Sequence, residues 1–168
     1  MKKWNARMMV TLGVLIAVEI VLSRFLSINT WSFKIGFSFV PIVLAAMLYG
    51  PVGGGVTAAL GDFLGAVLFP IGPYFPGFTL TALLHGVVFG LFLHKKRTLP
   101  RIVGAVAINQ LILSLFLNSL WISMLYGSPY QALLVSRSAQ CVFLLAVQVA
   151  VTGAIDPLLS RCGRKVLA

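Results

Sequence analysis

The sequence predicts an all-α integral membrane protein, a single domain over residues 1–168 built as a bundle of six transmembrane helices. The first observation is composition: 60% of the residues are hydrophobic, 10% are charged and the mean hydropathy is +1.02. A soluble chain of this length cannot bury that much apolar surface. The second is charge placement, because ten of the thirteen Lys and Arg residues fall in three clusters, at residues 2–7, 95–101 and 161–165. Cytoplasmic loops carry the excess of Lys and Arg, so both termini and the 95–101 connection are expected in the cytoplasm.

A transmembrane helix needs about 20 apolar residues, so each apolar stretch between the clusters is long enough for more than one helix. Proline suits the first turn of a helix, where its missing N–H would be unpaired anyway, and Pro51, Pro76 and Pro129 stand near three expected starts. The second helix is short, and the Gly50-Pro51 pair separates it from the third. The six expected helices are Arg7–Phe25, Ile35–Tyr49, Val52–Phe69, Pro76–His94, Ile102–Tyr126 and Pro129–Arg161.

The first of these helices is expected to stay in the protein rather than act as a cleaved signal peptide. It contains Glu19 and ends at Ser23-Arg24-Phe25, without the small-x-small pattern of a cleavage site. With a cytoplasmic N-terminus, the outside receives the connections at residues 26–34 and 70–75 and the short turn near Gly127.

Motifs for several other functions are missing. The chain has no Gly-x-x-x-x-Gly-Lys-Ser/Thr phosphate loop, no His-Glu or His-x-x-x-His pair and no Gly-x-Ser-x-Gly elbow. Cys141 and Cys162 are not placed to form a disulfide or a metal site. We therefore expect no enzyme activity, no catalytic residues, no cofactor and no metal. The net charge of +10 is explained by topology and contact with anionic lipid, so no nucleic-acid partner is expected.

Polar residues inside the predicted spans are the main functional signal, because a charged group in hydrocarbon costs several kcal/mol and marks a candidate site. Glu19, Asp62, Asn118 and Arg137 each lie about 9–12 Å below the outer ends of four different helices, at 1.5 Å rise per residue. They are expected to meet at one level, in a ligand pocket open to the outside. The helical stripes that would face it are Gln110, Ser114, Asn118 and Trp121 on one helix, and Arg137, Gln140, Leu144 and Gln148 on the next.

A structural interpretation of the same residues stays open. Asp62 or Glu19 could pair with Arg137, and the amides could bond between helices. Aromatic side chains near this level, Trp31, Phe37, Tyr74, Phe75 and Trp121, are also typical of an interfacial girdle.

Small residues indicate close packing on two helices. Gly54, Ala58, Gly61 and Gly65 recur at spacings of 4, 3 and 4 and form one smooth face. On the first helix, Gly13 and Ala17 form a small-x-x-x-small face that suits another helix. Glu19 points to the opposite side, about 200° from Ala17 at 100° per residue.

Four segments carry a resemblance to a known family. They are Ile35-Gly36-Phe37-Ser38-Phe39-Val40-Pro41-Ile42, then Leu48-Tyr49-Gly50-Pro51-Val52-Gly53-Gly54, then Gly61-Asp62-Phe63-Leu64-Gly65, and Pro70-Ile71-Gly72-Pro73-Tyr74-Phe75-Pro76-Gly77-Phe78-Thr79. From Arg7 to about Asp156, the chain resembles the substrate-binding S component of energy-coupling factor (ECF) vitamin transporters. The stretch Leu22–Ile28 looks most like the folate branch.

The resemblance implies a six-helix membrane subunit of an ABC-type importer in the bacterial cytoplasmic membrane. Such a subunit binds a vitamin from outside, beneath capping loops, and is thought to topple in the bilayer to release it. It docks through small residues of its first helix onto a membrane coupling protein driven by two ATPase subunits. Gly13 and Ala17 match that docking position, with Gly where Ala is commoner.

A folate ligand suits the charges of this chain. Its two glutamyl carboxylates would meet Arg24, Lys34 or Arg137, since Arg holds a carboxylate through two hydrogen bonds. Its pterin edge would meet Asp, Asn or Gln, and aromatic rings would cover its faces. The substrate-binding candidates are Arg24, Trp31, Lys34, Asp62, Tyr74, Phe75, Asn118, Trp121, Arg137 and Gln140. The alternatives are an S component for another vitamin, or a membrane scaffold or assembly protein with no ligand.

Overall fold

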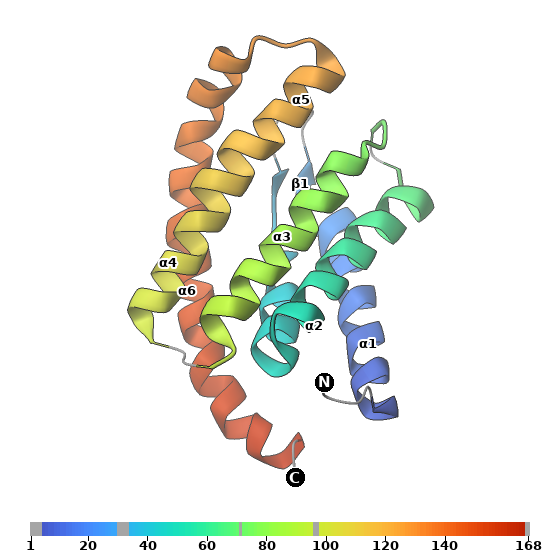
Figure 1. The fold of residues 1–168 in the computed structure, drawn as a ribbon, viewed down its shortest axis with the longest axis vertical. Helices are drawn as coiled ribbons and strands as arrows, with labels where there is room; N and C mark the ends of the chain where they lie inside the picture. Colours follow the sequence, from blue (N-terminus) through green and yellow to red (C-terminus); the bar gives the residue numbers. More distant parts are fainter. Residues whose placement is uncertain (1–4, 30–33, 71, 96–97, 167–168) are drawn as a thin grey trace.

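The computed structural model describes residues 5–29, 34–70, 72–95 and 98–166, and these form a helical bundle (Figure 1). Within the described residues, five helical stretches are long and apolar enough to cross a membrane. Four are α1 (Ala6–Arg24), α2 (Phe39–Leu68), α3 (Pro76–Leu93) and α6 (Tyr130–Val166). The fifth runs without interruption through α4 (Leu99–Ala107), the π-helix η1 (Ile108–Leu117) and α5 (Asn118–Tyr126).

The expected second and third helices lie within α2 and meet at a sharp bend. Gly50 has φ 79° and ψ −163°, outside the helical region, and this positive φ favours glycine because it has no Cβ. Pro51 follows and has no N–H to continue the helical ladder. A side chain at position 90 of α3 would collide with the Pro51 backbone, so the bend is packed directly against α3.

The first half of α2 begins later than expected, at Phe39 rather than Ile35. Residues 34 and 35 instead form β2 (Lys34–Ile35), which pairs antiparallel with β1 (Ile28–Asn29), Ile28 opposite Ile35. Sequence periodicity missed this hairpin because its strands are only two residues long.

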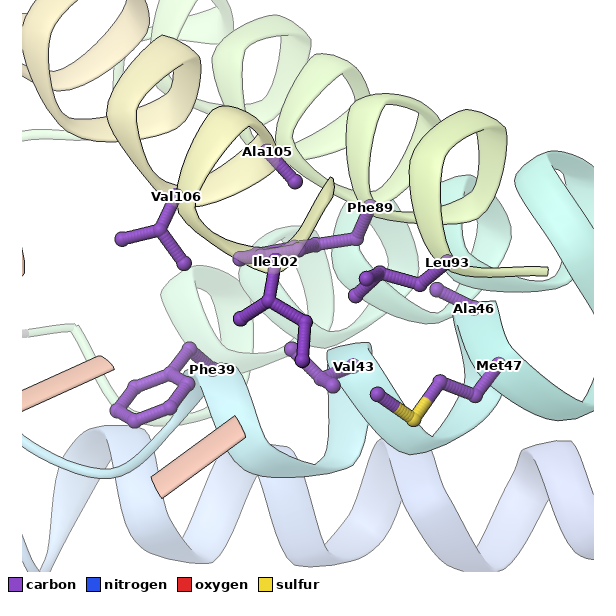
Figure 2. Close-up of a cluster of buried hydrophobic side chains, with 9 residues drawn as sticks. All are labelled: Phe39, Val43, Ala46, Met47, Phe89, Leu93, Ile102, Ala105 and Val106. Carbon is purple, nitrogen blue, oxygen red and sulfur yellow. The ribbon is translucent and has the colours of Figure 1, made fainter. Parts of the chain in front are cut away.

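A buried apolar cluster packs the first half of α2 against α3 and α4 (Figure 2). Its nine buried members are Phe39, Val43, Ala46, Met47, Phe89, Leu93, Ile102, Ala105 and Val106. They come from the first half of α2, the end of α3 and α4, at the lower end of the bundle in Figure 1.

The predicted glycine face packs closely, and it does so against two different helices. Gly54 lies against the backbone of Gly86 in α3. Gly61 and Gly65 instead lie against side chains of α1, where an added Cβ would collide with the Glu19 carboxylate and approach Nε of Arg24 at 2.9 Å. The second half of α2 therefore sits between α3 and α1, with its small residues turned toward both.

Helix α1 stands at the side of the bundle and packs mainly against α2. Its inner face carries Glu19, which is 4% exposed, whereas Gly13 and Ala17 on the other face are exposed. A Cβ added at Gly13 would meet nothing within 4 Å. The two faces of this helix are separated as the sequence predicts.

Candidate functional site

A cavity of about 540 Å³ opens among the helices, within the usual range of small-molecule sites. The segments at residues 36–38 and 72–75 contribute to its wall. Seven of the ten predicted substrate-binding residues line it: Arg24, Asp62, Tyr74, Phe75, Asn118, Arg137 and Gln140. Glu19 lines it as well, so the four polar groups expected at one level do surround one space.

Arg137 of α6 places a buried cation in the wall of this cavity. Its side chain is 5% exposed, and Nη1 donates to Oγ of Ser119 at 3.3 Å. Its Nε has no hydrogen-bond partner among the described residues. The alternative pairing with Asp62 is not found; the Asp62 carboxylate accepts a hydrogen bond from Thr79 at 2.9 Å. A guanidinium has five N–H donors, so the single hydrogen bond found among the described residues uses little of its bonding capacity.

The end of α1 brings a second cation to the same space. Arg24 lines the cavity beside Gly65, and its Nη2 lies 3.5 Å from the backbone oxygen of Asp62, a long hydrogen bond. Because glycine has no side chain, position 65 leaves the room that the guanidinium occupies. This contact places Arg24 at the cavity rather than in the lipid around α1.

The predicted stripe on α6 faces the cavity in full, since Arg137, Gln140, Leu144 and Gln148 all line it. The stripe on the preceding helix is correct for Gln110, Ser114 and Asn118 but not for Trp121. The reason is η1: bonds of the i→i+5 type place more residues in each turn than an α-helix has. Residues four apart therefore stay on one face, and Ile122 rather than Trp121 continues the stripe.

Trp121 lies behind the cavity wall and supports it. Its ring centroid is 5.5 Å from that of Phe75, which lines the cavity, and its Nε1 donates to Oγ1 of Thr81 at 3.0 Å. A side chain at Gly77 would collide with both rings. The structure therefore gives Trp121 contact with Phe75 rather than with the cavity itself.

One face of α3 completes the wall and was missed as a candidate. Phe78, Thr81, His85 and Phe89 line the cavity at spacings of 3, 4 and 4, the interval expected for one helical face. That interval was visible in the sequence, but most of this helix is apolar, so hydropathy alone did not single the face out. Gln110 and Gln148 were assigned to the stripes but not to the site, and both are buried, 3% and 8% exposed.

The remaining predicted residues lie elsewhere. Trp31 falls outside the described residues, and Lys34 belongs to β2, with its side chain outside what the structure describes. Gly13 and Ala17 lie on the outer face of α1, away from the residues that line the cavity.

Comparison with known proteins adds a family match, two relatives and one solved structure. Residues 7–156 match the family described as ECF transporter, substrate-specific component. The folate transporter FolT of Clostridium novyi is 40% identical over 138 residues, 82% of this chain and 79% of that protein. FolT of Leuconostoc mesenteroides is 32% identical over 157 residues, 89% and 84% of the two chains. A crystal structure of FolT bound with folic acid superposes with a TM-score of 0.85 at 37% identity, covering 90% of this chain and 93% of that one.

Proposed function

The chain belongs to the family of ECF transporter substrate-specific components, and from this premise we propose that it is the folate-binding subunit of an ECF-type importer. It captures folate from outside the cell and delivers it by docking onto a coupling protein driven by ATPase subunits. The chain itself is not an enzyme, and ATP hydrolysis belongs to those partners. The relatives with 40% and 32% identity are named folate transporters, and a similar structure holds folic acid.

The observation that carries the ligand assignment is the buried, uncompensated guanidinium of Arg137. A charge held away from water requires an opposite charge or several hydrogen bonds. Among the described residues Arg137 has one hydrogen bond, to a neutral hydroxyl, and no carboxylate partner. An anionic ligand group in the cavity supplies the missing charge. A glutamyl carboxylate fits because it can accept two parallel hydrogen bonds from a guanidinium.

The other end of the cavity favours a ligand that donates hydrogen bonds. The Oε1 atoms of Gln110 and Gln148 are buried and have no hydrogen-bond partner among the described residues. Both residues lie further from the 72–75 segment along their helices than Asn118 and Arg137 do (Figure 1). Unpaired buried carbonyl oxygens are costly, and the amino and ring N–H groups of a pterin would satisfy them. Folate would then lie with its pterin inward and its carboxylates toward Arg24 and Arg137.

We also propose six membrane-spanning segments with both termini in the cytoplasm. The two halves of α2 count as separate segments, which makes successive segments alternate in direction (Figure 1). The starts of α1 and α4 and the end of α3 lie at one end of the bundle, and this end carries exposed Arg7, Lys95 and Arg101. The excess of positive charge assigns that end to the cytoplasm. The 72–75 segment then faces outward, and the membrane is the bacterial cytoplasmic membrane.

Docking onto the coupling protein is assigned to the outer face of α1. Gly13 and Ala17 are exposed there, and small residues let another helix approach closely. Because Glu19 and Arg24 on the inner side line the cavity, one helix presents one face to the partner and the other to the ligand.

Isothermal titration of the purified protein tests the proposal. We expect tight binding of folic acid in the absence of ATP and added metal, and weaker binding of pteroate, which lacks the glutamyl carboxylates. Riboflavin and thiamine serve as comparison ligands. Tight binding of another vitamin with no response to any folate would refute the substrate, and no binding of any of these ligands would favour a scaffold protein.

A further inference from the structure

The segment at residues 72–75 is tied to the ends of α2 and α3 by a chain of hydrogen bonds. The hydroxyl of Tyr74 lies 3.1 Å from Oγ1 of Thr79, and Oγ1 of Thr79 donates to Oδ2 of Asp62 at 2.9 Å. The Tyr74 ring also packs edge-on against Phe63, with centroids 5.9 Å apart. One hydroxyl, that of Thr79, therefore joins the outer segment to a carboxylate on α2.

The direction of each hydrogen bond in this chain follows from the number of protons. A threonine hydroxyl has one hydrogen, and Thr79 donates it to the Asp62 carboxylate. Tyr74 must then donate its own hydrogen to Thr79. A hydrogen bond to a carboxylate is stronger than one between neutral groups, so Asp62 fixes the Thr79 hydroxyl and, through it, Tyr74.

We propose that Thr79 is a positioning residue that holds the 72–75 segment over the cavity and thereby sets how long a bound ligand stays. Thr79 is not among the residues that line the cavity, whereas both of its partners are. It acts on the ligand through Tyr74, by keeping that side chain in the wall. The inference rests on the proposed function, because the ligand used to test it is folate.

Such a role has a kinetic signature. A ligand enters while the covering segment is displaced, and it leaves only when that segment opens again. Weakening the attachment of the segment therefore raises the dissociation rate and leaves the association rate unchanged or faster. Because Thr79 does not line the cavity, the effect should be the same for every ligand that fits beneath the segment.

The test is stopped-flow binding of folic acid to the full-length protein in detergent, followed by tryptophan fluorescence. Thr79→Val keeps the shape of the side chain and removes its hydroxyl, and we expect dissociation about ten-fold faster. Thr79→Ser restores the hydroxyl and should return the rate close to that of the wild type. Thr11→Val is the matched control, because among the described residues the Thr11 hydroxyl bonds within its own helix, to the Arg7 oxygen at 2.8 Å.

Tyr74→Phe provides the second test, since it removes the other hydroxyl in this chain of hydrogen bonds. The Tyr74 side chain is 43% exposed, so the protein should tolerate the substitution. We expect a similar acceleration of dissociation. Because both substitutions break the same chain of hydrogen bonds, the dissociation rate of the double variant should not exceed that of the faster single variant. If Thr79→Val is unstable, Tyr74→Phe alone decides the outcome.

Three results would overturn the inference. They are unchanged dissociation in Thr79→Val or Tyr74→Phe, fully additive effects in the double variant, or an effect on folic acid that is absent for pteroate. The last would mean that Thr79 or Tyr74 acts by contacting the glutamyl group. In each of these cases wild-type binding of folic acid still stands, whereas failure of the wild type to bind folates would refute the proposed function instead.

Discussion

Replacing Arg137 with Ala should weaken folate binding while leaving the ligand-free protein at least as stable. The side chain is 5% exposed and makes one hydrogen bond, to Ser119 at 3.3 Å. That bond contributes about 1 kcal/mol to stability, whereas holding an unpaired charge away from water costs several kcal/mol. Its removal should therefore not lower the melting temperature of the ligand-free protein. A structural ion pair would behave in the opposite way, because breaking it leaves a second buried charge alone.

The expected loss of affinity follows from the same burial. Truncating one partner of a desolvated charge pair costs about 2–5 kcal/mol, because the other charge stays unpaired. At 1.4 kcal/mol for each factor of ten, the dissociation constant for folic acid should rise roughly 30-fold to 4,000-fold. Arg137→Lys keeps the charge but loses the planar guanidinium that binds a carboxylate through two hydrogen bonds. Its affinity for folic acid should therefore lie between those of the wild type and Arg137→Ala.

Titration calorimetry and thermal unfolding of the same preparations provide the measurement. Arg101→Ala is the matched control, because Arg101 is exposed and does not line the cavity. Wild-type affinity in a folded Arg137→Ala protein would refute the ligand assignment. Clear destabilisation of the ligand-free variant would show instead that Arg137 is held by a structural partner.

The remaining predictions concern packing, docking and the cavity wall. Gly61→Ala should destabilise the protein by about 1–3 kcal/mol in thermal unfolding because the new methyl group collides with α1, whereas Gly153→Ala, which meets nothing within 4 Å, should not. Replacing Gly13 and Ala17 together with Leu should leave folic acid binding intact and abolish co-purification with the coupling protein and folate uptake; loss of binding with co-purification retained would reverse the assignment of the two faces. Trp121→Ala should weaken folic acid binding by about 0.5–1.5 kcal/mol through loss of ring contact, with Trp121→Phe intermediate, and an unchanged titration would show that the wall holds without this support.

The apolar spans could be read from the sequence because a helix that crosses hydrocarbon must satisfy its own backbone and cover it with apolar side chains. That requirement is local, so the observed α1, α3 and α6 begin within a residue of the predictions. The start of α2 was misplaced by four residues, at Ile35 instead of Phe39. Its true start depends on a hairpin between residues 28–29 and 34–35, and pairing across a loop leaves no periodic signal.

Which way each side chain points was harder to predict. In a soluble protein the apolar face of a helix marks the core, but a helix in lipid is apolar on both sides, so hydropathy says little about its rotation. Only polar residues broke this symmetry, which is why the stripe from Arg137 to Gln148 was found and the aromatic residues of α3 were not. Trp121 was assigned by α-helical spacing, and the π-helix before it changed that spacing.

The sequence by itself determined the membrane-protein class, the helical stretches, the outward face of Gly13 and Ala17, and the polar groups that would meet between helices. These follow from the cost of placing charge and unpaired backbone in hydrocarbon, which each segment meets alone. Only the tertiary structure decided that Asp62 bonds Thr79 rather than Arg137, that Gly61 and Gly65 receive side chains from α1, and that Trp121 stands behind Phe75. These choices depend on how neighbouring helices are rotated and how closely they approach, and packing among all of them fixes both together.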